Sequence, residues 1–190
     1  MRKVILASAS PRRRELLATL GVPFDVEVSG YEEDMTLHKS PREMVKNFAL
    51  EKAKAVAVRH SDVVVIGADT VVAYGKHILG KPHTPARIKE MMHLLSEKMH
   101  RVWTAYAIVD TRTSKSITRV TEAKIFFKKL SSREINEYAS RAESLDCAGG
   151  YAIQGAARAF VKRIDGDYNA IVGLPLASLS EDLVKCGVQF

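Results

Sequence analysis

The sequence predicts an α/β protein with a mixed β-sheet. Segments with helical periodicity alternate along the chain with short β-branched and aromatic runs, which is typical of a sheet covered by helices. A continuous aliphatic run within residues 62–66 indicates a strand buried on both faces. At least two strand pairs are joined by short turns, one of them at Gly75–Lys76, and such hairpins argue against a purely parallel sheet. The 190 residues are expected to form a single domain spanning 1–190, or two closely joined lobes.

The amino-terminal segment combines a short strand with a helix start. Residues 4–6 are aliphatic and predict a buried strand that ends at Ala7. Ser10 has N-cap chemistry, and Pro11 suits the first helical position. The helix that follows is expected to place three apolar side chains on one side: Leu16, Leu17 and Leu20.

Three arginines, Arg12, Arg13 and Arg14, occupy the first turn of that helix, where the helix dipole favours acidic residues. Free backbone N–H groups, the hydroxyls of Ser8 and Ser10, and guanidinium groups at a strand-to-helix turn describe an anion-binding site. The alternative is a solvated basic turn.

The remaining helix starts carry recognisable capping signals. Ser40 with Glu43, and Ser131 with Glu134, form capping boxes, and Thr84–Pro85 opens another helix. Helices are therefore expected to begin near 40, 84 and 131, and a last helix to run over about 175–186. Further strands are expected at 24–28, 71–74, 77–79, 101–110, 116–127 and 160–164.

The amino-acid composition limits the classes of binding partner and the cellular compartment that we expect for this protein. The chain has 29 Lys and Arg against 22 Asp and Glu, a net charge of +7, which favours anionic partners. Aromatic residues make up 7%, and no basic stretch is interleaved with aromatics, so nucleic acid is the weaker option. No apolar stretch approaches the roughly 20 residues that span a bilayer, and the start of the chain does not resemble a signal peptide. Two cysteines without metal-ligand spacing indicate a reducing cytoplasm.

Two acidic positions are candidates for chemistry. Asp69 follows the predicted buried strand at 62–66, and open α/β sheets bind ligands at the carboxyl ends of their strands. An Asx-turn at the start of the next hairpin is the alternative for Asp69. Glu33 belongs to an acidic loop with Glu32 and Asp34, and such loops are usually only solvated.

Two lysines stand out by their positions. Lys52 falls four residues after Phe48 and four before Val56, on the apolar stripe of its predicted helix. Its ammonium either reaches the rim of the protein or points into a cleft that needs positive charge. Lys81 lies on a loop braced by Pro82, and a solvated lysine is the alternative there.

Gln154 lies in a glycine-rich segment, residues 148–155, whose glycines allow close approach to a ligand or simply form turns. The sequence contains no Walker motif, dinucleotide-binding fingerprint or nucleophile elbow. No His, Cys and Asp cluster has zinc-ligand spacing. The interpretations as a Walker-type ATPase, a dinucleotide-binding protein, a hydrolase with a nucleophile elbow and a zinc-site protein are therefore disfavoured.

Five segments in the same order resemble the Maf family of nucleoside triphosphate pyrophosphatases. They are LASASPRRRELL (6–17), IGADTVV (66–72), ILGKP (78–82), AGGYAIQG (148–155) and GDYNAIVGLP (166–175). The resemblance implies an ITPase-like fold, with an elongated mixed sheet flanked by helices and a central cleft between two lobes. It also implies a homodimer and hydrolysis, dependent on Mg²⁺ or Mn²⁺, of a nucleoside triphosphate to the monophosphate and pyrophosphate.

The resemblance also assigns roles to individual residues. Asp69 matches the catalytic proton acceptor and a metal ligand, and Glu33 matches the second carboxylate that holds the metal. Substrate-binding positions are matched by Ser8, Arg12, Arg13, Lys52, Thr70, Lys81 and Gln154. Among these, Arg12, Thr70 and Gln154 match positions tied to substrate choice.

Gln154, together with the GDY segment at 166–168, is similar to the branch that acts on dTTP and UTP. The branch that acts on 7-methyl-GTP tends to carry glutamate at the first of these positions. Three hypotheses follow: a dTTP/UTP pyrophosphatase, a pyrophosphatase for a modified nucleotide such as 7-methyl-GTP, and a septation regulator that binds nucleotide or nucleic acid without turnover. A role in cell-division arrest or in clearing the nucleotide pool is implied by the resemblance alone.

Overall fold

Seven strands of the computed structural model, which describes residues 2–34 and 40–190, form one mixed sheet. They are β1 (Lys3–Leu6), β2 (Phe24–Val26), β3 (Val63–Tyr74), β4 (His77–Leu79), β5 (Met99–Asp110), β6 (Lys115–Phe127) and β7 (Val161–Asp165). The strand order is β2-β1-β3-β5-β6-β7, and β4 pairs with β3. β1 is parallel to both β2 and β3, whereas β4 is antiparallel to β3 and β7 to β6. The predicted α/β class with a mixed sheet is therefore confirmed.

Four helices begin where the sequence signals place them, near residues 10, 40, 84 and 131. The helices are α1 (Pro11–Ala18), α2 (Pro41–Ala57), α3 (Pro85–Leu95), α4 (Ser132–Ser140), α5 (Tyr168–Val172) and α6 (Leu176–Lys185), with 3₁₀ turns η1 (Ala148–Gly150) and η2 (Ala156–Phe160). Both predicted capping boxes, at Ser40 and Ser131, are formed. Ser10 is the N-cap of α1 but makes no side-chain cap bond. None of the helices within 2–34 and 40–190 combines the length and hydrophobicity that crossing a bilayer requires.

Strand β3 differs from the prediction. The segments 62–66 and 71–74 were expected as separate strands with Asp69 beyond the first, but one strand runs from Val63 to Tyr74 and contains Asp69. Gly67 does not break it, because the missing side chain lets α2 pack directly on the strand. A Cβ at Gly67 would lie 2.2 Å from the Ala49 carbonyl oxygen and 2.6 Å from the Ala53 nitrogen. Gly67 therefore serves the close packing of α2 on β3.

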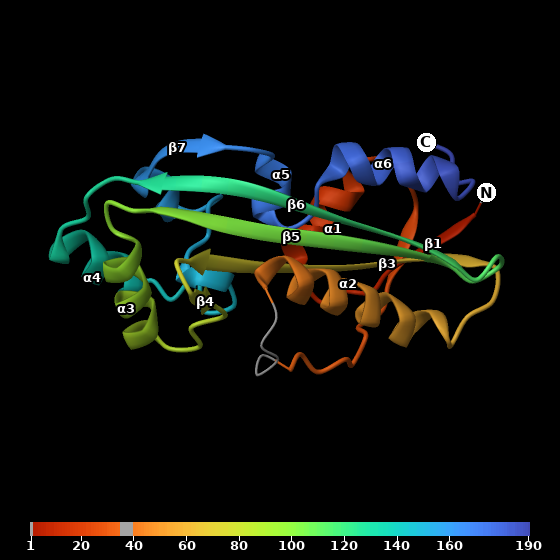
Figure 1. Ribbon diagram of the computed structural model, residues 1–190, viewed down its shortest axis with the longest axis horizontal. Coiled ribbons are helices and arrows are strands. Elements are labelled where there is room, and N and C mark those ends of the chain that lie inside the picture. Colours follow the sequence, from red (N-terminus) through yellow and green to blue (C-terminus); the bar gives the residue numbers. More distant parts are fainter. Residues whose placement is uncertain (1, 35–39) are drawn as a thin grey trace. The chain divides into compact units, whose positions relative to one another are not determined.

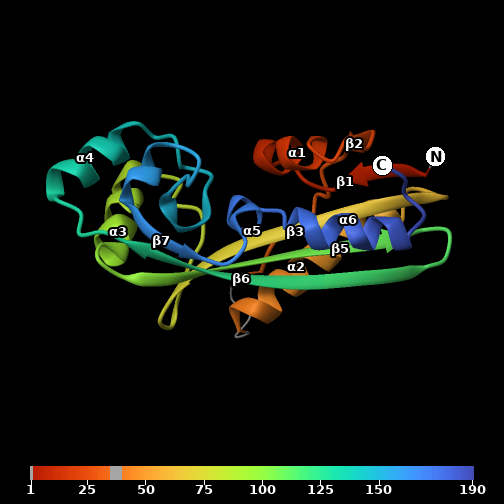
Figure 2. The same cartoon turned by 90° about the horizontal axis from the view of Figure 1, so that it is seen from above.

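The described chain divides into two compact units. The first comprises Met1–Asp69, Thr104–Thr121 and Gly173–Phe190. In this unit α2 covers one face of the strands, and α1 and α6 cover the other (Figures 1 and 2). Alternate residues of β3, such as Val64 and Ile66, pack with Leu17 of α1 and Leu179 of α6. The odd-numbered positions of this strand, including Gly67 and Asp69, lie on the opposite face and are directed toward α2, because successive side chains of a strand point to opposite faces.

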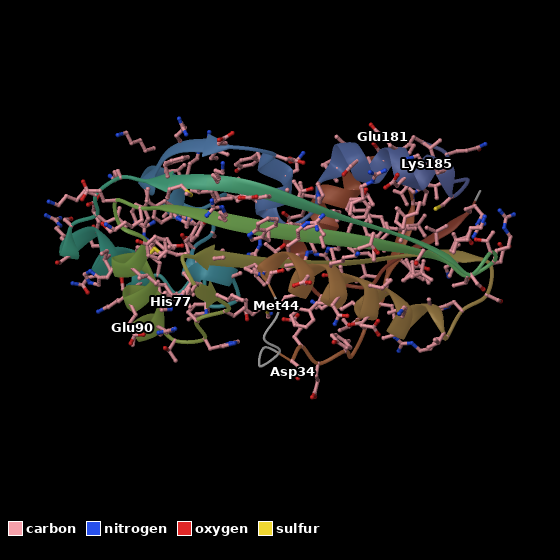
Figure 3. The ribbon with its side chains drawn as sticks, viewed as in Figure 1. Asp34, Met44, His77, Glu90, Glu181 and Lys185 are labelled. Carbon is pink, nitrogen blue, oxygen red and sulfur yellow. The ribbon has the colours of Figure 1, made fainter. Side chains whose placement is uncertain are left out.

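Helix α6 is fixed to the first unit by a buried carboxylate. Asp182 is fully buried and accepts hydrogen bonds from Tyr106 Oη (2.8 Å), Arg119 Nε (2.6 Å) and Lys185 Nζ (2.6 Å). These donors hold the pKa of Asp182 well below its usual range, chiefly through the Arg119 hydrogen bond. Figure 3 shows Lys185 and Glu181 on the outer side of α6.

The second unit comprises Thr70–Trp103 and Glu122–Val172. Helices α3 and α4 lie side by side in it (Figures 1 and 2). A chain of edge-to-face aromatic contacts forms part of its core and includes His100, Phe127, Tyr138, Tyr151 and Phe160. This packing links β5 and β6 to the glycine-rich segment that carries Gln154.

Candidate active site

Three of the predicted site residues of the first unit form one cluster. The Lys52 ammonium donates to Glu33 Oε1 at 2.5 Å and to Asp69 Oδ1 at 2.7 Å. The Lys52 side chain is 12% exposed, so its ammonium is largely buried between the two carboxylates. Two carboxylates from distant parts of the sequence thus share one largely buried cation.

Each member of the cluster is positioned by its own element. Asp69 projects from β3 toward α2, and Lys52 lies on α2 one turn beyond the fully buried Phe48. The ring of Tyr31 lies 6.2 Å from that of Phe48, which holds the acidic loop against α2 and brings Glu33 to Lys52. Asp34, the last acid of this loop, is exposed and points outward in Figure 3.

Asp69 is electrostatically unusual. It is 4% exposed, and its second oxygen, Oδ2, is buried with no hydrogen-bond partner among the residues described. Burial raises the pKa of Asp69, the Glu33 charge raises it further, and Lys52 opposes both. A buried carboxylate oxygen without a donor is stabilised by a proton or a cation.

Ser8 and Arg13 form a second contact group at the start of α1. Arg13 donates from Nη1 to Ser8 Oγ at 3.3 Å and from Nε to the Gly173 carbonyl at 3.1 Å. Burial lowers the pKa of Arg13, and the charges of Asp69 and Glu33 oppose that shift. Arg12, on the same turn, is half-buried. The Gly173 contact could not be predicted, because nothing local in either segment indicates it.

The remaining predicted residues belong to the second unit. Thr70 follows Asp69 in β3 and is half-buried, whereas Lys81 and Gln154 are exposed. The loops that carry Lys81 and Gln154 are tied together, since the Gly149 N–H donates to the Gly80 carbonyl at 3.1 Å. Three sets of predicted residues, or the loops that carry them, therefore lie together: Glu33 with Lys52 and Asp69, Ser8 with Arg13, and the Lys81 loop with the Gln154 segment.

The chemistry of these groups defines a class of protein. Arginines at a helix start bind anions, and a carboxylate with a raised pKa beside a buried lysine is typical of a catalytic acid–base group. An α/β protein with such a site is expected to act on a phosphorylated anion.

Comparison with known proteins identifies the family. Residues 3–186 match the family model described as "Maf-like protein", and the chain belongs to the Maf family. A protein of Bacillus thuringiensis subsp. konkukian named dTTP/UTP pyrophosphatase is 48% identical over 189 residues, which are 100% of this chain and 98% of that protein. A Bacillus mycoides protein of the same name is 48% identical over 183 residues, 96% of this chain and 95% of that protein. The predicted family resemblance is thus confirmed.

One solved structure, that of the Staphylococcus aureus Ham1 protein, aligns with 66% of this chain and 71% of its own. The sequence identity is 13% and the TM-score 0.47. This likeness is too remote to bear on the fold or the function.

Proposed function

We propose that this protein hydrolyses dTTP and UTP to the nucleoside monophosphate and pyrophosphate. The names of relatives that match nearly the whole chain at 48% identity support the reaction and the substrates. The cluster of Glu33, Lys52 and Asp69 is the observation that carries the proposal. It supplies a proton acceptor and charge neutralisation, the two things that attack of water on a phosphoanhydride requires of a protein.

In the proposed reaction, water attacks the α-phosphorus and the bond to the bridging oxygen of the β-phosphate breaks. Asp69 accepts the proton of the attacking water on its carboxylate, while Lys52 donates to Oδ1 of the same group. Lys52 holds the carboxylate in position and opposes the rise in its pKa that burial causes. Arg12, Arg13 and Lys81 bind the phosphates and offset the charge of the leaving pyrophosphate.

The carboxylates of this cluster also fit a divalent cation. Glu33 and Asp69 already share one cation, the Lys52 ammonium, and Asp69 Oδ2 has no donor among the described residues. No group of three or more potential metal ligands occurs in the described chain, but Mg²⁺ commonly binds one or two carboxylates and takes its other ligands from water and substrate phosphates. We propose that Glu33 and Asp69 hold Mg²⁺ or Mn²⁺. A bound ion would supply positive charge at the phosphate oxygens during hydrolysis.

The proposal is tested by measuring pyrophosphate release from a panel of canonical and modified nucleoside triphosphates, with Mg²⁺, with Mn²⁺ and with a chelator. We expect the highest kcat/KM for dTTP and UTP and no turnover with the chelator. Absence of turnover across the panel would instead favour a regulator that only binds nucleotide. Preference for 7-methyl-GTP would favour the modified-nucleotide alternative.

Lys52→Ala is expected to lower kcat/KM for UTP by about 10²–10³-fold, because it leaves two adjacent carboxylates without their shared cation. Lys54→Ala on the same helix is the matched control, since Lys54 is 52% exposed and pairs with Glu51 at 2.9 Å. The test is to measure kcat/KM for UTP in both variants by steady-state kinetics. Equal, small effects of the two substitutions would remove Lys52 from the mechanism.

Gln154 is proposed to read the base, with Thr70 and Arg12 shaping the pocket. The pairing edge of uracil or thymine presents an N–H donor beside carbonyl acceptors, and a carboxamide can satisfy both. Guanine presents two adjacent donors, which suit a carboxylate. An unmatched buried polar group costs about 1–3 kcal/mol.

Gln154→Glu is therefore expected to lower the ratio of kcat/KM for UTP to that for 7-methyl-GTP by about 10-fold or more. Gln189, near the carboxyl terminus and exposed, provides a Gln→Glu control that should leave the ratio unchanged. An unchanged ratio in Gln154→Glu would mean that base choice is made elsewhere.

We further propose that the protein works in the cytoplasm as a homodimer. The proposal rests on the family resemblance, and the dimer can be checked by sedimentation equilibrium. A single species at the 21.0 kDa of one chain would contradict it.

A further inference from the structure

We infer that Tyr138, Ser144 and His100 are positioning residues for base selection, because they fix the loop that presents Gln154. The inference rests on the proposed function, since it assumes that Gln154 reads the base. The Gln154 loop is defined here as residues 150–155. The three residues come from α4, from the turn after it and from β5, and all belong to the second unit.

The three side chains hold three successive residues of the loop. Ser144 Oγ donates to the Gly150 carbonyl at 2.8 Å, and the Ala152 N–H donates to Tyr138 Oη at 3.0 Å. Between these two bonds, His100 Nε2 lies 2.8 Å from Tyr151 Oη. Ser144, His100 and Tyr138 are 0%, 1% and 2% exposed, so water does not compete for these bonds.

Packing reinforces the hydrogen bonds. The Tyr151 ring lies edge-to-face against Phe127 at 5.0 Å and His100 at 5.4 Å between centroids. Burial lowers the pKa of His100 to about 4, so its bond to Tyr151 is made by a neutral imidazole and persists through neutral pH. Gly150, at φ +73°, packs so closely on α3 that a Cβ there would meet Met91 Sδ at 3.0 Å.

The backbone is anchored on both sides of the glutamine, because the Gly155 N–H also donates to the Ala152 carbonyl at 2.9 Å and the Ala156 N–H to Glu143 Oε1 at 3.0 Å. Tyr151 and Ile153 are each 5% exposed, and Gln154 follows them as an exposed side chain. Residues 150–152 are held in place, and they set the position of the backbone that leads to Gln154. A small displacement of these residues would therefore move the Gln154 carboxamide. Selectivity by hydrogen bonding is sensitive to such displacement, because these bonds weaken steeply with distance and angle.

The contacts act on the loop and not on the reacting carboxylate. All three are made to residues 150–152, whereas Asp69 is held by Lys52 in the first unit. Loosening the loop should therefore change which base is accepted more than it changes the rate of the chemical step. For UTP, we expect KM to rise while kcat stays within about twofold.

The test compares Tyr138→Phe with Tyr106→Phe. Both substitutions remove one hydroxyl from a buried ring, but Tyr106 bonds to Asp182 at 2.8 Å in the first unit. We expect the ratio of kcat/KM for UTP to that for 7-methyl-GTP to fall about 5- to 10-fold in Tyr138→Phe and to stay unchanged in Tyr106→Phe. The ratio is measured on one preparation, so the folded fraction cancels. Equal ratios in the two variants would overturn the inference.

Hydrogen–deuterium exchange supplies a readout that does not depend on turnover. Faster exchange confined to residues 150–155 is expected in Tyr138→Phe and not in Tyr106→Phe, and unchanged exchange there would overturn the inference. Ser144→Ala removes the bond to Gly150 and serves the same test if Tyr138→Phe does not fold. If the wild type hydrolyses no nucleotide, the proposed function fails, and selectivity is then read from the dissociation constants of UTP and 7-methyl-GTP.

Discussion

Replacing Asp69 by asparagine is expected to reduce kcat by about 10²–10⁴-fold, the usual contribution of a general base. The amide has nearly the same shape as the carboxylate. Its carbonyl oxygen can still accept the hydrogen bond from Lys52, which is 2.7 Å long with Asp69. It cannot accept a proton from water at neutral pH. Nucleotide affinity should therefore change much less than turnover.

The experiment measures kcat at saturating UTP and saturating Mg²⁺, so that weakened metal binding does not mimic a catalytic loss. Asp25→Asn is the control, because Asp25 is 66% exposed and pairs only with the exposed Lys3 in the described structure. Near-normal kcat in Asp69→Asn would remove this residue from the catalytic role.

Gly67→Ala is expected to have the second largest effect, on stability and activity together. The new methyl group would lie 2.2 Å from the Ala49 carbonyl oxygen, and backbone cannot yield as a flexible side chain does. Helix α2 must then move off β3, which costs about 1–3 kcal/mol or more. The same movement separates Lys52 on α2 from Asp69 on β3, so kcat/KM should fall as well.

Urea unfolding of Gly67→Ala and the wild type measures the loss of stability. Gly80→Ala is the matched control, because a Cβ at Gly80 would have no atom within 4 Å and its backbone conformation is ordinary. Equal stability of Gly67→Ala and the wild type would show that α2 adapts without cost.

The sequence predicts helix starts well where they depend on side chains a few residues apart. The capping boxes at Ser40 and Ser131 fix helix starts through side chains three residues apart, and such short-range patterns can be recognised in the sequence. Strand β3 was predicted as two separate segments, and the contact of Gly67 with α2 inside the continuous strand is not contained in a local pattern. The short helices η1, η2 and α5 were not predicted, since each spans only three to five residues.

The candidate site was predictable residue by residue, but its assembly was not. The position of Lys52 on an apolar stripe left two placements for its ammonium, the rim of the protein or a cleft, and in the structure its side chain is 12% exposed. Its pairing with Glu33 depends on the packing of Tyr31 against Phe48, a tertiary contact without a sequence signal. The roles assigned to the site residues come from the family motifs and not from spacing, and they remain predictions.

Continuity of β3 through Asp69 limits how the gene can change. Side chains of a strand alternate between its faces, so inserting or deleting one codon between Gly67 and Asp69 would reverse the direction of the carboxylate. Asp69 would then face Tyr106 and Leu174, far from its lysine, and a buried charge would be left among apolar groups. Exchanges among the aliphatic residues of this strand can be absorbed by repacking, but a change of length cannot. We expect descendants of this sequence to vary in the composition of β3 while keeping its length.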